Sequence, residues 1–261
     1  MDRSVRIGIQ IQPQHADYST IRSTVDRAEE LGVDIIFNWD HFFPLTGDHE
    51  GKHFECWTML GAWAEQTEAV EIGALVTCNA YRNPELLADM ARTVDHVSGG
   101  RLILGIGSGW FQKDFDEYGY DFGTKGSRLD DLAAAIPRIE ERWSKLNPSP
   151  TRPIPILIGG GGEKKTLRIT AQHADIWHGY GSPSKMAHKH RVLDGHCDTV
   201  GRDSAEIERS AGVGATRIDD AEDYYSIGTR LFTLAFSGPS YDLGPLPDWL
   251  AFRDERNALR T

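Results

Sequence analysis

Eight short apolar runs recur along the 261-residue chain, and segments with helical spacing of apolar residues separate them. Apolar runs of about four to eight residues are typical of buried strands. Parallel strands that are covered on both faces have this composition, without the strict alternation of a half-exposed strand. We expect strands near 5–11, 34–38, 70–77, 101–106, 154–158, 174–178, 207–213 and 230–236.

An eightfold alternation of strand and helix predicts a (β/α)8 barrel, whose usual length is about 250 residues. We expect one domain that spans residues 1–261 and a long loop at 107–126. An open, doubly wound sheet is the alternative fold, and an open sheet or fewer than seven parallel strands would contradict the barrel. The expected helices lie near 18–32, 53–67, 83–100, 127–146, 163–172, 183–200, 221–227 and 249–260.

Charge and cysteine content narrow the class of protein. The formal net charge of −11 argues against nucleic acid as the main partner. Cys56, Cys78 and Cys197 form no CxxC pair, which indicates a reducing compartment and no structural zinc. No apolar run is long enough for a membrane span, and the chain enters a strand at once rather than a signal peptide. We expect a cytoplasmic protein with no membrane partner.

A glycine run follows the fifth predicted strand. Gly159, Gly160, Gly161 and Gly162 precede Glu163, and apolar residues at helical spacing come next. Glycine lets an anion approach the main chain, and the free N–H groups at a helix start attract it. The spacing matches neither the P-loop nor the dinucleotide-binding fingerprint. The run therefore predicts a phosphate site of another kind, and a tight turn without a ligand is the alternative.

The segments after the strands predict the character of a shared cavity, because strand ends face one mouth in this fold. These segments contain aromatic and small residues and few charges. Such a lining suits a flat, apolar, conjugated ligand with a polar tail. The segments are 38–44, 77–82, 107–112, 159–162, 178–181 and 237–239.

Asp40 and His41, directly after the second strand, are the candidate catalytic residues. Imidazole titrates near neutrality and suits proton transfer. The alternative is a structural cap beside a surface ring. A nearby group resembles a metal site in composition, but its spacing in a glycine-containing loop predicts a solvated loop and no metal. That group comprises Asp48, His49, Glu50 and His53.

Three further features have two possible roles each. Arg82 could bind an anion or pair with Asp89 or Glu85. Residues 117–120 could form a lid or a plain loop. A tryptophan group could line a cofactor site, but we expect it in the core or at a subunit interface; it comprises Trp39, Trp57 and Trp63.

Residues 73–88, 94–110 and 154–179 resemble the luciferase-like flavin and deazaflavin oxidoreductases, and the resemblance covers nearly the whole chain. Residues 38–44 resemble the branch that uses coenzyme F420, in which an Asp-His pair lies beside the deazaflavin ring. The resemblance implies a luciferase-like barrel that transfers a hydride between F420 and a small organic substrate. We also expect a homodimer.

The resemblance also implies roles for individual residues. A non-prolyl cis peptide between Leu75 and Val76 would support the ring, Asp40 would touch its polar edge, and His41 would assist proton movement. Ser108 and the glycine run would hold the tail. The implied cofactor-binding residues are Asp40, Leu75, Val76, Thr77, Ser108, Gly109, Trp110, Gly159, Gly160, Gly161, Gly162 and Glu163.

One position departs from this branch. Its sugar-phosphate dehydrogenases have an acidic residue where this chain has Trp110, so a sugar phosphate is not the expected substrate. Two other functions stay open. An FMN-dependent luciferase-like monooxygenase needs a lid over its flavin, and 107–126 is the longest candidate. A non-catalytic barrel that binds flavin or deazaflavin is the second alternative.

Overall fold

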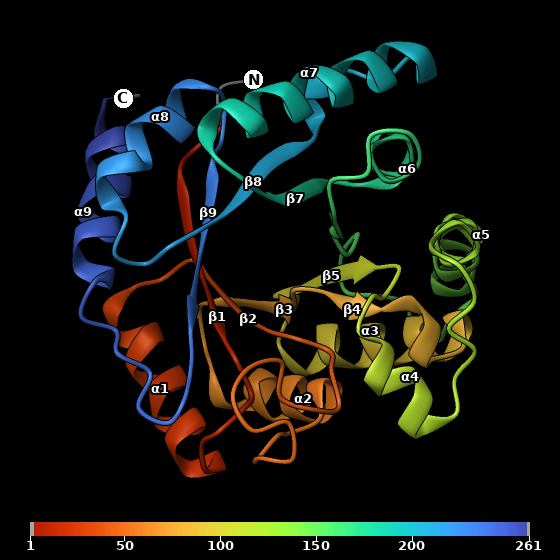
Figure 1. The fold of residues 1–261 in the computed structure, drawn as a ribbon, viewed down its shortest axis with the longest axis horizontal. Coiled ribbons are helices and arrows are strands. Elements are labelled where there is room, and N and C mark those ends of the chain that lie inside the picture. Colours follow the sequence, from red (N-terminus) through yellow and green to blue (C-terminus); the bar gives the residue numbers. More distant parts are fainter. Residues whose placement is uncertain (1–2, 260–261) are drawn as a thin grey trace.

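The structure is a computed structural model that describes residues 3–259. These residues form a closed parallel barrel surrounded by helices (Figure 1). The sheet closes because β3 pairs with both β2 and β5. The strands are β1 (Arg6–Ile11), β2 (Ile35–Asn38), β3 (Glu71–Ala74), β4 (Thr77–Cys78), β5 (Leu102–Gly107), β6 (Ile156–Gly159), β7 (Ile176–Tyr180), β8 (Glu208–Val213) and β9 (Leu231–Phe236).

The predicted (β/α)8 barrel is confirmed, and the open sheet is wrong. Each predicted strand has its counterpart, and the third is divided into β3 and β4, which occupy one barrel position. Leu75 and Val76 lie between the two halves, and the peptide bond that joins them is cis. The third strand is therefore interrupted at the place that the family resemblance indicated.

The helices follow the predicted order with two differences. They are α1 (Tyr18–Leu31), α2 (Cys56–Gln66), α3 (Pro84–Val97), α4 (Gln112–Tyr118), α5 (Lys125–Lys145), α6 (Thr166–His173), α7 (Pro183–Val200), α8 (Ala221–Ser226) and α9 (Leu246–Ala258). The end predicted for the closing helix, Arg260, lies outside the described residues. Local sequence explains where α3 begins. Asn83 caps α3, because its side chain accepts from the backbone N–H groups of Glu85 and Leu86.

The prediction of an unstructured loop at 107–126 is wrong, because this segment contains α4. The helix has seven residues and ends at Gly119, whose φ of 71° is left-handed. Two turns are too few to produce a helical pattern of apolar residues in the sequence. Residues 117 and 118 therefore belong to a helix, and 119 and 120 follow its end.

The helix after the glycine run begins three residues later than predicted. Residues 163–165 form a turn, in which the Leu167 N–H donates to the Gly162 carbonyl at 3.0 Å. Thr166 is the first helical residue. The free N–H groups of α6 therefore start beyond the glycines.

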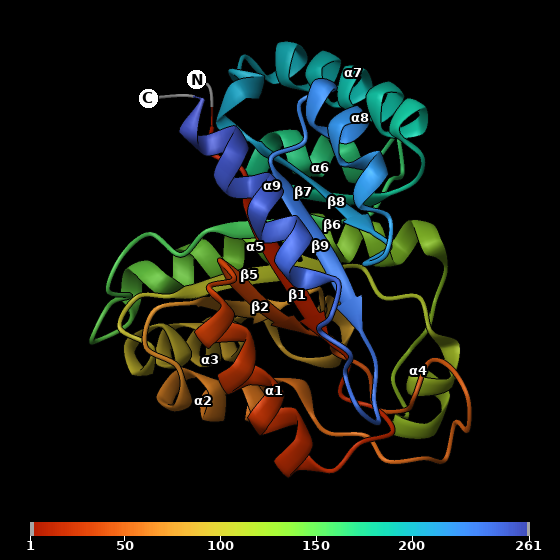
Figure 2. The ribbon, with the colours of Figure 1, turned by 90° about the vertical axis from the view of Figure 1, so that its left-hand side faces the viewer.

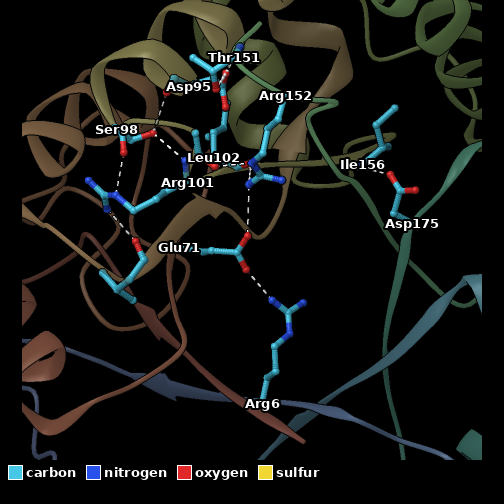
Figure 3. Close-up of polar contacts among 12 residues, drawn as sticks. Arg6, Glu71, Asp95, Ser98, Arg101, Leu102, Thr151, Arg152, Ile156 and Asp175 are labelled. Atoms are coloured by element: carbon cyan, nitrogen blue, oxygen red, sulfur yellow. Dashed lines mark hydrogen bonds and ion pairs between the residues drawn. The ribbon is translucent and has the colours of Figure 1, made fainter. Parts of the chain in front are cut away.

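An ion-pair network lies at the N-terminal end of the barrel, and Figure 3 shows its Arg6, Glu71 and Arg152 side chains. Arg6 joins Glu71 and Glu208 with N–O distances of 2.5 Å each, and Arg152 reaches the other oxygen of Glu71 at 3.2 Å. Above it, a cluster of buried apolar side chains fills the barrel interior. The members are Ile35, Phe37, Leu75, Ile103, Leu157, Ile176 and Leu231. The apolar layer separates this end of the barrel from the C-terminal end.

The outer core lies between the strands and the helices. In Figure 2, α9 lies across the outer face of β1 and β9, and Asn257 exchanges two hydrogen bonds with the backbone of Val5. The three tryptophans that could have formed a subunit interface are buried within this chain. Trp39, Trp57 and Trp63 are 6%, 3% and 0% exposed, which assigns them to the core.

Candidate active site

Asp40 lies at the end of β2 with its carboxylate fully buried. Arg82 donates to both oxygens, at 2.5 Å and 3.0 Å, and the Cys78 backbone N–H donates to one of them at 2.9 Å. Arg82 also pairs with Glu55. The two partners predicted for Arg82 are paired elsewhere. Glu85 pairs with Arg138, and Asp89 pairs with Arg92 and Arg142.

His41 lies beside Asp40 in sequence but bonds to a different carboxylate. Its Nδ1 is 2.6 Å from Oδ2 of Asp114, a residue of α4 whose side chain is fully buried. The same oxygen accepts the hydroxyl of Tyr81 at 2.9 Å, and the other accepts the Phe42 backbone N–H at 3.0 Å. Asp114 was missed because it fell in the segment read as a loop. Its place in the first turn of a short helix was the only available signal.

Aromatic rings surround the imidazole of His41. The rings of Trp39, Trp110 and Phe111 each meet it edge-on, at centroid distances of 5.7 to 5.8 Å. Trp110 is 63% exposed, which is unusual for so large an apolar side chain. Trp110 therefore offers an exposed aromatic ring next to His41.

Three of the four residues with metal-like composition bond to partners outside the group. His53 accepts the Trp39 indole N–H at 3.0 Å, and burial, with a smaller effect from His41, lowers the pKa of His53 to about 4. His49 bonds the Pro44 carbonyl at 2.6 Å, and Glu50 pairs with Lys113. Among residues 3–259, no group of three or more His, Cys, Asp or Glu side chains is arranged to hold a metal ion.

Leu75 and Val76 form a shelf at the mouth. Gln10 on β1 supports it, because its amide donates to the Leu75 carbonyl at 2.8 Å. Val76 packs against two glycines. A Cβ on Gly107 would lie 2.8 Å from one Val76 methyl, and a Cβ on Gly159 would lie 3.0 Å from the other. The shelf is thus in contact with the starts of both segments predicted to hold the cofactor tail.

Thr77, next to the shelf, is fully buried, and its hydroxyl has no hydrogen-bond partner in the described structure. Buried polar groups are usually paired, so an unpaired hydroxyl beside a predicted ligand site is consistent with a ligand partner.

A cavity of about 250 Å³ opens at the mouth between Leu75 and the ends of β7, β8 and β9. Gln10, Thr233 and Tyr180 contribute polar atoms, and none of the lining residues is charged. Tyr180 lies over Gly212, where a Cβ would come within 2.1 Å of its ring. Sequence reasoning missed Gln10 and Thr233, because they lie inside strands rather than after them.

His178 lies against Tyr180 with its ring edge-on at a centroid distance of 4.8 Å. It is buried, its Nδ1 is 2.8 Å from the Ser210 hydroxyl, and its Nε2 has no partner among the described residues. Burial lowers the pKa of His178 to about 3, so the ring is neutral at physiological pH.

The glycine run makes a sharp turn at the end of β6. Gly160 has a φ of 131°, which side chains rarely adopt, and its N–H donates to the His178 carbonyl at 3.0 Å. A Cβ on Gly162 would lie 2.6 Å from the Thr166 hydroxyl. Gly161 has neither constraint, since its nearest contact would be Lys189 at 3.8 Å. The run leaves an open approach to the backbone at Gly161.

Glu163 is exposed and bonds two side chains of α7. Lys189 and His188 contact the same carboxylate oxygen at 2.5 Å and 3.1 Å, and these hydrogen bonds lower the pKa of Glu163. On the other side of the shelf, Ser108 is half-buried after β5, and Gly109 has a left-handed φ of 79°. A Cβ on Gly109 would collide with Cys78 and Phe115, at 2.6 and 2.9 Å.

The predicted site residues thus lie at one end of the barrel in two arrangements. The shelf contacts the starts of the Ser108 segment and the glycine run through Val76. His41 and Trp110 contact each other beside α4. Asp40 is enclosed by its ion pair, and its predicted contact with a ring edge stays a prediction.

Comparison with known proteins gives consistent similarities. A sequence model described as luciferase-like monooxygenase matches residues 4–237. An F420-dependent glucose-6-phosphate dehydrogenase of Amycolatopsis mediterranei is 33% identical over 155 residues, which is 52% of this chain and 46% of that protein. The chain spans about half the length of the curated relatives it matches.

Solved structures show the same fold at low sequence identity. An F420-dependent secondary alcohol dehydrogenase in complex with an F420-acetone adduct superposes with a TM-score of 0.84 and 17% identity, over 93% of this chain and 96% of that one. A coenzyme F420-dependent tetrahydromethanopterin reductase from Methanopyrus kandleri gives a TM-score of 0.73 and 16% identity, over 94% and 98%.

Proposed function

Because the chain belongs to the luciferase-like monooxygenase family, we propose that it is an oxidoreductase that transfers a hydride between coenzyme F420 and a small organic substrate. The observation that carries the proposal is the placement of His41 and the Leu75–Val76 shelf at the same barrel mouth as the glycine turn. The relative in Amycolatopsis mediterranei and two structural neighbours are named as F420-dependent enzymes, which supports this choice of cofactor.

The residues present fit a deazaflavin. A flat ring fits the uncharged cavity in front of Leu75, where Gln10 and Thr233 offer polar atoms to a ring edge. The unpaired hydroxyl of Thr77 lies next to the same shelf. The open backbone at Gly161 and the start of α6 suit a phosphate on the tail, because free N–H groups attract anions.

When bound, F420 supplies a carbon that accepts or donates a hydride. The protein must orient that ring, exclude water and move a proton to or from the substrate oxygen. We propose that His41 exchanges this proton, since it is the predicted catalytic residue beside the exposed ring of Trp110. Asp40 would act as the buried support of Arg82 and the β4 backbone, in addition to its predicted contact with the ring.

The lining of the cavity supports an uncharged substrate. No lysine or arginine lines it, and Trp110 presents an apolar face beside His41. A phosphorylated substrate needs cationic or backbone donors for its phosphate. We therefore do not propose the sugar-phosphate reaction named for the relatives.

Two further proposals concern the setting of the protein. In residues 3–259, no helix is long and apolar enough to cross a membrane. We propose a cytoplasmic homodimer that has neither nucleic acid nor a membrane as partner, in line with the negative net charge.

Titration of the purified protein with F420 and with FMN, followed by absorption and fluorescence, tests the cofactor. We expect micromolar or tighter binding of F420 and weaker binding of FMN. If FMN binds well and F420 does not bind, the FMN-dependent monooxygenase replaces this proposal. If neither binds, the chain is not a cofactor-dependent enzyme of this kind.

A further inference from the structure

We propose that Asp114 is the positioning residue of the candidate active site, which keeps a proton on Nδ1 of His41 and leaves Nε2 to exchange a proton with the substrate. The hydrogen bond between Asp114 and His41 does not depend on which reaction the protein catalyses. The role of Asp114 in turnover rests on the proposed function.

The contacts of Asp114 define its protonation state. It is fully buried, and its two oxygens face three partners: the Phe42 backbone N–H, the Tyr81 hydroxyl and Nδ1 of His41. Burial, with smaller effects from Cys78 and Asp114, raises the pKa of Tyr81, so its phenol stays protonated and donates. An ionised carboxylate can only accept, and it matches this set of donors.

Both oxygens of Asp114 already accept from other donors, so the carboxylate is also the acceptor toward His41 and the proton lies on Nδ1. Nδ1 therefore carries a hydrogen whether His41 is neutral or charged. Nε2 makes no hydrogen bond to any of residues 3–259, so it is the atom that gains and loses a proton.

The other groups around His41 do not compete for this role. Trp39, Trp110 and Phe111 present ring edges, and the neutral His53 accepts from Trp39. The remaining nearby charges are paired, in the contacts Arg82–Asp40, Arg82–Glu55 and Lys113–Glu50, and His49 bonds a carbonyl. Asp114 is thus the carboxylate that stabilises a positive charge on His41.

The reaction then balances in both directions. In oxidation, the substrate C–H bond gives its hydride to the cofactor, the O–H proton passes to Nε2 of His41, and a C=O bond forms. Asp114 stabilises the imidazolium that results, as a buried carboxylate does for the histidine of a hydrolase triad. In reduction, the protonated Nε2 returns the proton to the substrate oxygen.

The test uses the cofactor-free protein first. Long-range ¹⁵N–¹H spectra are recorded for wild type and for His41→Gln, both with ¹⁵N-labelled histidine. The signals that are absent from the His41→Gln spectrum belong to His41. We expect the pattern of a hydrogen on Nδ1 and a free Nε2. A neutral His41 with its hydrogen on Nε2 in wild type would overturn the inference, whatever cofactor the protein binds.

Steady-state kinetics with F420 are the second part of the test. Asp114→Asn should lose the Nδ1–H pattern, and kcat should fall about 10²- to 10⁴-fold. F420 affinity should stay within about twofold, and the acidic limb of the pH profile of kcat/KM should move to lower pH. Tyr81→Phe is the matched control, because it removes another donor to the same oxygen and should leave the His41 pattern unchanged.

The outcomes separate the two proposals. If wild type shows the expected pattern but binds no F420, the proposed function fails and the positioning role stands. If F420 turnover is present and Asp114→Asn matches wild type in kcat and in the His41 pattern, the positioning role fails alone. If Asp114→Asn does not fold, the wild-type spectrum decides.

Discussion

Arg82 donates a hydrogen bond to each carboxylate oxygen of Asp40, at 2.5 Å and 3.0 Å, although the sequence placed these residues in different strand-end segments. The pair is buried at the barrel mouth and connects the end of β2 to the segment that follows β4. An ion pair therefore holds these two segments together at the C-terminal end of the barrel.

Replacement of Arg82 by leucine should lower the free energy of unfolding by about 3–5 kcal/mol, because it leaves the Asp40 carboxylate buried without its partner. Urea unfolding followed by circular dichroism measures this change. Arg138→Leu is the control, since it removes an exposed pair with Glu85 that solvent screens, so its loss should change stability little. Equal losses in the two variants would contradict the prediction.

Replacement of Gly161 by valine should weaken F420 binding ten- to a hundredfold, a loss of about 1.4–2.8 kcal/mol, by blocking approach to the backbone. Fluorescence titration measures the affinity. Gly160→Val should also reduce stability, because its φ of 131° strains any side chain. If both variants remain folded and bind F420 as wild type does, the cofactor tail is held elsewhere.

Replacement of His41 by alanine should reduce kcat by about 10²-fold or more and leave F420 affinity nearly unchanged, because His41 acts on the proton and not on the tail. Steady-state kinetics and a binding titration on the same preparation separate the two effects. His49→Ala provides the comparison, since the His49 ring hydrogen-bonds the Pro44 carbonyl and does not contact His41 in the described structure, so its loss should change kcat little. Parallel losses of kcat and affinity in His41→Ala would argue for a structural role.

The network in Figure 3 lies at the opposite end of the barrel and should affect stability alone. Glu208→Ala removes one of two carboxylates from Arg6, which should cost about 1–3 kcal/mol in the free energy of unfolding. Affinity for F420 and kcat should match wild type, because the apolar layer separates the two ends. A change in kcat larger than twofold would show that the ends are coupled.

Stability should also fall in mild acid because of His178. Its pKa is about 6.5 in the unfolded chain and about 3 in the folded barrel, so the unfolded state binds more protons between these values. The free energy of unfolding therefore falls as the pH drops below about 6.5. His178→Gln should reduce the loss between pH 7 and pH 5 by about 2 kcal/mol, measured by urea unfolding at each pH. An unchanged difference would show that His178 titrates normally.

The sequence predicted the barrel and the place of the mouth because each strand is a separate apolar run with its own helix. It could not predict Asp114, since the pairing with His41 joins residues 73 positions apart through a helix of two turns. It also could not place Gln10 or Thr233 in the cavity. Their side chains point inward from strand interiors, and only barrel closure shows which strands face each other.

The contacts of Val76 have a consequence for protein engineering. Its methyl groups occupy the space that side chains at Gly107 and Gly159 would need. A larger residue at either glycine is blocked while Val76 is present, and a smaller residue at 76 alone would leave a void between two strands. A library that varies one of these positions at a time would therefore recover few active clones. Varying positions 76, 107 and 159 together would change the shape of the barrel mouth and leave no void between the strands.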